Sequence, residues 1–270
     1  MTARPLHEAL ADHPSITLPD LVSRASLLTR VDRKYLLPQA TVEDVLSRLP
    51  ADTQVLEIDG RRGFTYHSLY FDTPDLTSYL TTAYRRRRRF KVRTRLYAHS
   101  GECWLEVKTT GARGSTVKQR LRYDPRHYTT LTPGRSFVDE VLAEHRVADG
   151  ARLTLQPTLA TRYVRTTLYL PDTHSRVTLD TDLHWQDGDR TLSLPGMVVI
   201  ETKTGSALSS VDRLLWRRHC RPCRMSKYGT GLAALRPHLP ATHWRRTLRR
   251  GFARAVHTAG HRLYVPDAVA

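Results

Sequence analysis

Charged residues at every second position are the feature of this sequence that most restricts its fold. In Phe-Lys-Val-Arg-Thr-Arg-Leu, residues 90–96, basic side chains alternate with apolar or threonine side chains. A period of two is typical of a β-strand, because successive side chains of a strand point to opposite faces. We therefore expect a strand over 89–97 with one cationic and one mainly apolar face. The direction of the cationic face then decides the function.

The same alternation recurs elsewhere in the chain. Charged residues two positions apart are Arg30, Asp32 and Lys34; Glu106 and Lys108; Lys118, Arg120 and Arg122; Arg176, Asp180 and Asp182, with Thr178 between them; and Glu201 and Lys203. One such strand is compatible with an ordinary solvated sheet face, but several together weaken that interpretation. Each strand needs one buried face. If the apolar faces pack under helices, the charged faces line the lumen of a wide barrel.

The hydrophobic pattern predicts about eight strands and few helices. The strands are expected over 26–38, 64–73, 89–97, 102–110, 115–124, 157–171, 175–185 and 194–204. Helical segments are expected over 40–50, 75–83, 134–148, 209–220 and 224–235. The last stretch, 243–260, places Leu248, Phe252 and Val256 at helical spacing beside an arginine-rich side. An α+β, mainly β chain of this kind favours an antiparallel barrel or sandwich.

The charge balance points to a polyanionic partner. The formal net charge is +17, from 43 basic and 26 acidic residues. Nucleic acid, anionic lipid and a phosphate-rich small molecule are all compatible with this charge. Acidic residues among the basic ones favour a metal–triphosphate site, where carboxylates hold Mg²⁺ or Mn²⁺ and Arg and Lys hold phosphate oxygens. Only 8% of the residues are aromatic, which disfavours a stacking surface for nucleic acid.

The cysteines and the apolar segments indicate the compartment. Cys220 and Cys223 have CxxC spacing, but the only other cysteine is Cys103, so a four-cysteine zinc site cannot form. Two ordinary thiols in a reducing compartment are the better interpretation. No apolar run approaches the ~20 residues of a membrane span, and no signal peptide is apparent. We expect a soluble, cytoplasmic protein.

Nine short motifs together resemble a known family. In order they are RVDRKY (30–35), YHSLYFDT (66–73), KVRTRLY (91–97), LEVKTT (105–110), VKQRLRY (117–123), PTLATRYVR (157–165), RVTLDTDL (176–183), VVIETK (198–203) and MSKYGTG (225–231). Over roughly residues 25–235 they resemble the VTC domain, the polyphosphate-polymerase domain of the vacuolar transporter chaperone complex. That family belongs to the triphosphate tunnel metalloenzymes, or CYTH proteins.

The resemblance implies an eight-stranded antiparallel closed barrel with surrounding helices, whose charged lumen binds a triphosphate and a divalent metal. It divides the chain into an N-terminal segment (1–24), a tunnel domain (25–240) and a basic C-terminal helix and tail (241–270). It places Arg85 to Arg88 at the tunnel mouth or in solvent. Matched motif by motif, it implies phosphate binding by Lys34, Arg93, Arg95, Lys108, Lys118, Arg120, Tyr163, Arg165, Arg176 and Lys203, metal binding by Glu201, and a catalytic role at the terminal phosphate for Ser226 and Lys227.

The implied activity is transfer of the ATP γ-phosphoryl group to a growing polyphosphate chain, with Mn²⁺ or Mg²⁺ as cofactor and a short phosphate primer as a possible start. Many tunnel enzymes carry glutamates in the first motif, whereas this chain has Arg30 and Asp32. Fewer carboxylates suggest one metal and fit a polymerase better than a hydrolase. The alternatives are a tripolyphosphatase or nucleoside triphosphatase, and a polyphosphate-binding module without turnover. No nucleic-acid partner and no transmembrane segment are expected.

Overall fold

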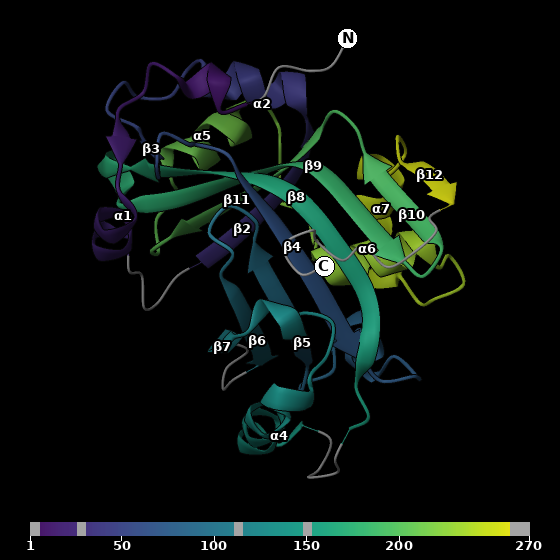
Figure 1. The fold of residues 1–270 in the computed structure, drawn as a ribbon. Coiled ribbons are helices and arrows are strands. Elements are labelled where there is room, and N and C mark those ends of the chain that lie inside the picture. The colour runs from purple at the N-terminus through teal and green to yellow at the C-terminus, as the bar shows by residue number, and fades with distance from the viewer. Residues whose placement is uncertain (1–5, 26–30, 111–115, 148–152, 260–270) are drawn as a thin grey trace. The chain divides into compact units, whose positions relative to one another are not determined.

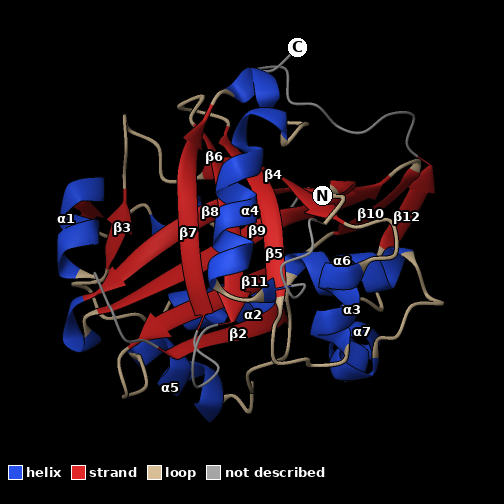
Figure 2. Ribbon diagram, turned by 90° about the horizontal axis from the view of Figure 1, so that it is seen from below, coloured by secondary structure: helices blue, strands red, loops and turns tan. Residues whose placement is uncertain are grey.

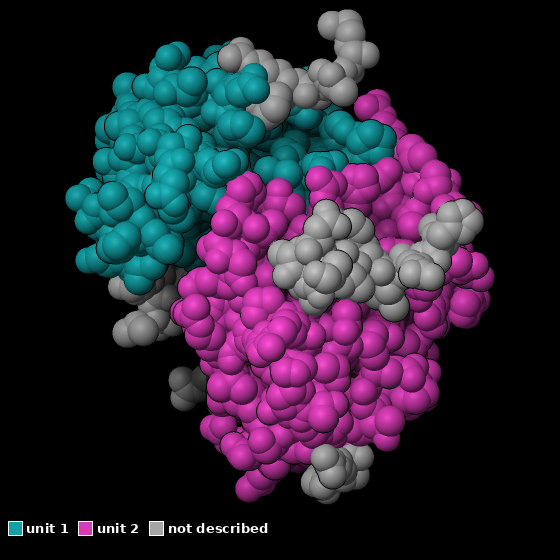
Figure 3. Space-filling view, in the orientation of Figure 1, with its two compact units in different colours: residues 1–64, 163–183, 194–224 teal, residues 65–162, 184–193, 225–270 magenta. Residues whose placement is uncertain are grey.

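The fold is given by a computed structural model, which describes residues 6–25, 31–110, 116–147 and 153–259 (Figure 1). The chain forms two compact units, coloured separately in Figure 3. Unit 1 comprises residues 1–64, 163–183 and 194–224, and unit 2 comprises residues 65–162, 184–193 and 225–270. Two long strands, β8 (Gln156–Leu170) and β9 (Ser175–Asp187), contribute residues to both units.

Unit 1 contains strands that are neighbours in the order β2 (Val31–Pro38), β11 (Met197–Thr204), the first part of β9, the second part of β8, β3 (Gln54–Leu56) and β1 (Ser15–Ile16). Its helices are α1 (Leu18–Arg24), α2 (Gln39–Leu46) and α5 (Ser210–Arg217), with 3₁₀ turns η1 (Glu8–Leu10) and η6 (Pro171–Thr173). Alternate residues of the central strands, such as Tyr35, Leu179 and Ile200, form one core with Val42 of α2 and Leu215 of α5. The residues between them therefore project from the opposite face.

Unit 2 contains strands in the order β12 (Val256–Ala259), β10 (Arg190–Leu194), the end of β9, the start of β8, β4 (Phe64–Asp72, from Thr65 onward in this unit), β5 (Phe90–Tyr97), β6 (Cys103–Thr110) and β7 (Thr116–Tyr123). Its helices are α3 (Thr77–Ala83), α4 (Arg135–Glu144), α6 (Lys227–Leu235) and α7 (Arg245–Gly251), with 3₁₀ turns η3 (Pro125–His127), η4 (Thr132–Gly134) and η7 (Thr242–Trp244). Helix α4 lies across β5–β7 (Figure 2). Val138 and Val141 of α4 share a core with Val92, Leu105 and Val107.

All eight expected strands are present, and the class, α+β and mainly β, is confirmed. The prediction of a closed eight-stranded barrel is wrong, because the structure has one 12-stranded sheet that is not closed. Four short strands, β1, β3, β10 and β12, were not expected. Closure requires the edge strands to pair. Within the described residues, β7 pairs only with β6 and β2 only with β11, while β8 and β9 take additional neighbours, so the sheet branches instead of closing.

The expected C-terminal helix is shorter than its apolar spacing suggests. Helix α7 ends at Gly251, and Val256 belongs to β12, where its side chain is 47% exposed. Glycine weakens a helix, and the backbone beyond it pairs with β10 instead. The three cysteines all lie in the described part of the chain and form no disulfide. Among the described helices, none has the length and hydrophobicity needed to cross a bilayer. Arg30 lies outside the described residues.

Candidate functional site

The residues expected at the site fall into two groups, one in each unit. The unit 1 cluster consists of Lys34, Tyr163, Arg165, Arg176, Glu201 and Lys203. The unit 2 cluster consists of Arg93, Arg95, Lys108, Lys118, Arg120, Ser226 and Lys227.

Strand pairing assembles the unit 1 cluster. On β11, Glu201 lies opposite Lys34 of β2, and Lys203 lies opposite Arg176 of β9. Residues directly opposite each other share a face of the sheet. The Lys34 ammonium donates a hydrogen bond to Glu201 Oε1 at 2.8 Å, and Lys203 Nζ lies 4.0 Å from Glu201 Oε2. The predicted alternation therefore brings one carboxylate and several cations together.

Helix α5 holds the two strands that carry Lys34 and Glu201. Ser209 and Asp212 form a capping box at its N-terminus. The fully buried Asp212 carboxylate also accepts hydrogen bonds from Tyr35 of β2, at 2.6 Å, and from Thr202 of β11, at 2.9 Å. A buried carboxylate with several donors fixes the position of its partners. The same side chain thus starts the helix and joins it to both strands.

The charges of the unit 1 cluster act strongly on one another. Burial by itself raises the pKa of Glu201, but the positive charges of Lys203, Lys34 and Arg165 outweigh burial and hold this pKa well below its usual range. Burial lowers the pKa of Lys203 to about 8, and the neighbouring Arg176 acts in the same direction. Glu201 is therefore an anion at neutral pH, while part of the Lys203 population can lose its proton near pH 8.

A second ion pair orients Arg165. Its guanidinium donates two hydrogen bonds to the Asp180 carboxylate, at 2.6 and 2.8 Å, and lies 5.3 Å from the ring centroid of the buried Tyr163. A two-pronged pair of this kind fixes the plane of the guanidinium. The sequence placed Asp180 on the charged face without giving it a role, although its position four residues after Arg176 was the available signal.

The strand residues of the unit 2 cluster lie on β5, β6 and β7. Strand register forms two rows of opposite residues: Lys91, Lys108 and Lys118 in one row, and Arg93, Glu106 and Arg120 in the next. The Glu106 side chain is fully buried. It accepts a hydrogen bond from Arg93 Nε at 2.7 Å and pairs with Lys118. Burial lowers the pKa of Lys118. Glu106 therefore offsets repulsion among cations that the fold places side by side.

Strand β4 supports the arginines of β5. Arg93 donates to the Tyr70 hydroxyl at 2.9 Å, and Arg95 donates to Ser68 Oγ at 3.2 Å. Arg95 also lies 5.4 Å from the ring centroid of Tyr66. No role was predicted for these three residues from the sequence. Their period of two in YHSLYFDT, with polar groups at 66, 68 and 70, was the signal that could have identified them.

Ser226 and Lys227 form the start of helix α6, as expected. Ser226 is the N-cap, and its hydroxyl accepts a hydrogen bond from the Gly229 amide at 2.9 Å. Lys227 is the first helical residue, and its carbonyl accepts a hydrogen bond from Trp185 Nε1 at 2.8 Å. Amide groups and the dipole at a helix N-terminus favour anions. Ser226 therefore has a structural role in addition to the proposed phosphate contact.

The next residue, Tyr228, ties α6 to the rest of unit 2. Its hydroxyl donates to the buried Asp72 carboxylate, which also accepts amide hydrogen bonds from Ser78 and Tyr79 of α3. Burial raises the pKa of Asp72, although these hydrogen bonds oppose the shift. The Tyr228 ring stacks on Tyr70, with centroids 5.1 Å apart. Because Tyr70 contacts Arg93, the helix that begins at Lys227 shares a support with the cationic strand.

The donor set limits how a metal could bind. No three His, Cys, Asp or Glu side chains gather into a metal-binding group anywhere in the described ranges. Glu201 therefore lies among cations and, within the described residues, does not belong to a group of three or more such ligands. Mg²⁺ commonly binds one or two carboxylates together with substrate phosphates and water. The residues present fit one ion that is shared with a bound polyphosphate, and they do not form an all-protein metal cage.

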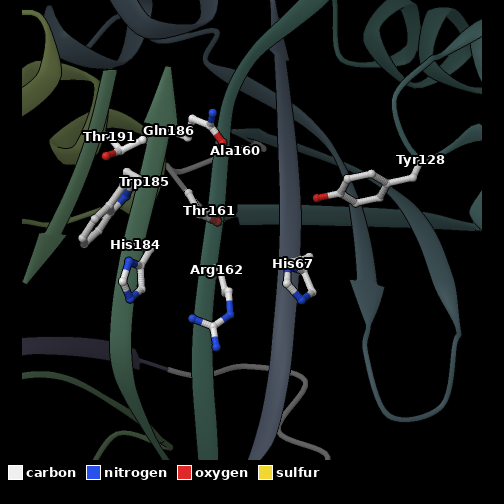
Figure 4. Close-up of a pocket in the computed structure, with 9 residues that line it drawn as sticks. All are labelled: His67, Tyr128, Ala160, Thr161, Arg162, His184, Trp185, Gln186 and Thr191. Carbon is white, nitrogen blue, oxygen red and sulfur yellow. The ribbon is translucent and has the colours of Figure 1, made fainter. Parts of the chain in front are cut away.

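A separate pocket lies in unit 2 (Figure 4). It has a volume of about 370 Å³ and is lined by His67, Tyr128, Ala160, Thr161, Arg162, His184, Trp185, Gln186 and Thr191. Arg162, His67 and His184 project along one side of this pocket. None of the residues that the sequence predicted for the phosphate site lines it. The candidate site therefore consists of the charged strand faces and the α6 start, not of this cavity.

Comparison with known proteins gives one family. A family model described as the VTC domain matches residues 29–236. No curated protein matches the chain. Among solved structures, HpAC1 from Hippeastrum, a candidate adenylyl cyclase described as having a dominant triphosphatase activity, is 20% identical with a TM-score of 0.48, covering 80% of this chain and 100% of its own. A candidate adenylate cyclase from Bacillus halodurans is 15% identical with a TM-score of 0.47, covering 73% and 94%.

Proposed function

Because the chain belongs to the VTC domain family, we propose that it transfers the γ-phosphoryl group of ATP to the end of a growing inorganic polyphosphate chain. The observation that carries this proposal is the family match over residues 29–236, whose cationic motifs form the two charged clusters. ATP and polyphosphate are both polyanions, so the same kinds of side chain can bind donor and acceptor. A short phosphate could serve as the first acceptor.

The clusters supply positioning and charge, which are what phosphoryl transfer mainly requires. In our proposal, Arg93, Arg95, Lys118 and the neighbouring cations of unit 2 hold phosphate oxygens. Within unit 1, Lys34, Arg165, Arg176 and Lys203 are likewise proposed to hold phosphate oxygens. The ion pairs with Glu106 and Asp180 keep the arginine planes oriented before substrate arrives. This preorganisation reduces the cost of arranging charge during the reaction.

Glu201 is the proposed metal ligand. A bound Mg²⁺ or Mn²⁺ would withdraw charge from phosphate oxygens and fix their orientation. The low pKa of Glu201 keeps its carboxylate ionised over the whole physiological range. Lys34 donates a hydrogen bond to Glu201. If Glu201 binds a metal, Lys34 must donate to another acceptor, and the phosphate oxygens of the substrate are suitable acceptors. Glu201 and Lys34 therefore change partners together when substrate binds.

The reaction breaks the bond between the γ-phosphorus and the β,γ-bridging oxygen, and forms a bond to a terminal oxygen of the acceptor chain. ADP leaves, and the polymer grows by one phosphate. We propose that Lys227, at the N-terminus of α6, stabilises the transferring group, because its ammonium is a compact and mobile positive charge. Ser226 holds the helix start in place and can offer its hydroxyl to the terminal phosphate.

The decisive experiment incubates purified protein with ATP and either Mn²⁺ or Mg²⁺. Acid-stable polymer should accumulate together with ADP in matching amounts. ADP with free phosphate and no polymer would identify water as the acceptor and make the protein a triphosphatase. Polyphosphate binding without ADP formation would identify a binding module. Either of these results would replace the proposed function.

A further inference from the structure

Helix α7 presents an unpaired arginine surface. Arg245, Arg246, Arg249, Arg250 and Arg254, on the helix and just after it, are all exposed. We call these five residues the α7 arginine surface. Within the described part of the chain, none of them forms an ion pair with a carboxylate, in contrast to Arg93, Arg165 and Arg236. Five exposed cations that form no carboxylate ion pair among the described residues give a concentrated positive potential, which attracts a polyanion.

The opposite side of the same segment is fixed to unit 2. Residues four apart lie on one helix face, and Thr247 and Gly251 are both buried. Before the helix, Trp244 is 2% exposed and packs against Tyr79 of α3, with ring centroids 5.5 Å apart. After it, Phe252 packs against Trp185 at 5.7 Å. Two buried aromatic anchors therefore hold the helix with its arginines directed outward.

The α7 arginine surface lies close to the start of α6. A Cβ atom added at Gly229 would lie 2.4 Å from the Trp244 ring, so these two residues pack in direct contact. Gly229 is two residues after Lys227, whose carbonyl is held by Trp185. Figure 2 shows α3, α6 and α7 side by side. The helix that carries the arginines therefore packs directly against α6, which begins at Lys227, the residue proposed to act on the terminal phosphate.

The side chains of the α7 arginine surface favour one kind of polyanionic ligand over others. A helix that inserts into a membrane interface needs an exposed apolar face, but Trp244 and Phe252 are buried within unit 2. A single-stranded nucleic acid needs exposed aromatic rings for stacking, and α7 offers none. All five cations are arginine, whose planar guanidinium matches phosphate oxygens bidentately. A flexible chain of phosphates satisfies these features best.

We propose that the α7 arginine surface is a second binding site, which holds long inorganic polyphosphate outside the phosphate-transfer site. The identity of this ligand rests on the proposed function, but the binding itself requires no turnover. A polymer bound at both sites gains an effective local concentration at the transfer site. The surface then favours retention of long chains over short ones.

The test measures equilibrium binding of long-chain polyphosphate and of tripolyphosphate to the full chain at near-physiological salt. In one variant, Arg245, Arg246, Arg249 and Arg250 are replaced by glutamine. The matched control replaces four exposed arginines dispersed over other elements, Arg24, Arg61, Arg126 and Arg217, by glutamine. Melting temperatures of both variants verify folding. ATP turnover is recorded separately, so failure of the proposed function is distinguished from failure of this one.

We expect the α7 variant to bind long polyphosphate about tenfold more weakly or worse, as when several phosphate contacts are lost together. Its affinity for tripolyphosphate should be unchanged, and the dispersed control should retain most of its affinity for the long polymer. If both variants lost the same affinity for long polyphosphate, the lower net charge would explain the loss, and the proposal would be overturned. Unchanged affinity, or a selective loss of binding to duplex DNA or to anionic phosphatidylserine vesicles instead, would overturn it as well.

Discussion

Glu201 is held as an anion by the cations around it, which makes its replacement informative. Glu201→Gln keeps the size of the side chain but removes the charge that a metal needs. We expect polymer synthesis to fall by about 10²-fold or more, as for the loss of one positioned charge. The apparent metal affinity should fall in parallel. Steady-state ADP release measured over a Mn²⁺ titration gives both values.

The control for this variant is Glu57→Gln. Glu57 pairs with Arg62 at 2.7 Å in the same unit but is not part of the cluster. Both variants lose one ion-paired carboxylate, and the melting temperature of each variant shows whether the fold survives the substitution. Only the Glu201 variant should lose turnover. Full activity after Glu201→Gln would remove this residue from the site.

Lys227 tests whether the α6 start acts on the transition state or only on bound ATP. The Lys227→Ala substitution leaves the backbone carbonyl, and with it the hydrogen bond from Trp185, in place. We expect kcat to fall by about 10²-fold, with a much smaller change in ATP affinity. Lys227→Arg should restore activity only in part, because a planar guanidinium does not replace a compact ammonium. A near-normal kcat with a raised KM would make Lys227 a binding residue only.

The face formed by β5, β6 and β7 depends on Glu106, and this gives a prediction about pH. The Arg93 and Lys118 charges outweigh burial and lower the pKa of Glu106 in the folded protein. A lowered folded-state pKa stabilises the fold fully above the unfolded-state pKa of about 4.5, and the stabilisation is lost as the pH falls below it. Glu106→Gln should therefore lower the free energy of unfolding at neutral pH by about 3–5 kcal/mol. As the pH falls, the variant should lose less stability than the wild-type protein.

The measurement is the melting temperature of both proteins from neutral pH down to acid conditions. Glu102→Gln is the control, because Glu102 pairs with Arg122 on the same sheet with both side chains well exposed. An exposed pair contributes little, so the Glu102 control should follow the wild-type curve. Parallel curves for wild type and the Glu106 variant would show that Glu106 carries no acid-sensitive stability.

The Tyr228 hydroxyl ties helix α6 to the buried Asp72 carboxylate. Tyr228→Phe removes the hydrogen bond to the buried Asp72 carboxylate and should cost about 1–3 kcal/mol of stability. Because Lys227 is the preceding residue, we also expect a drop in kcat, since small misplacements at a reacting group are expensive. Tyr79→Phe is the matched control: it removes a hydroxyl that donates to the Pro240 carbonyl in the same unit. A loss of stability without a drop in kcat would limit Tyr228 to folding.

Individual elements were predictable where the local pattern is sufficient. The alternation of Lys91, Arg93 and Arg95 with Val92 identified both the strand and its charged face, since the period of two is a local property. The sequence pattern likewise predicted helices over 209–220 and 224–235, where the structure has α5 and α6. The supports of the site were not predictable: Tyr70 and Tyr228 are far apart in sequence, and Asp72 gives no local sign of its partners. These contacts depend on tertiary packing.

The molecule as a whole departs from expectation in how its sheet ends. The eight strong strands were visible from their length and patterning, but β1, β3, β10 and β12 have two to five residues each, too few to show a period. β3 and β10 pair with the long strands β8 and β9, and β1 and β12 pair in turn with β3 and β10. Closure of the sheet is likewise decided by pairing between strands remote in sequence, which no local pattern encodes. The matched motifs suggested a barrel, whereas the pairing leaves β2 and β7 with one neighbour each in the described ranges.

The net charge of +17 leads to a final prediction, about salt. Binding of a polyanion releases the counterions condensed on it, so the logarithm of affinity falls linearly with the logarithm of salt concentration, with a slope that grows with the number of phosphates neutralised. ATP can contact only the cations at its triphosphate, whereas a long polymer also reaches the α7 arginine surface. The salt slope for long polyphosphate should therefore be steeper than for ATP. Replacing four α7 arginines should bring the polymer slope toward the ATP slope and leave the ATP slope unchanged. The two slopes come from titrations at several salt concentrations, and equal slopes in the wild-type protein would show that the polymer contacts no more cations than ATP does.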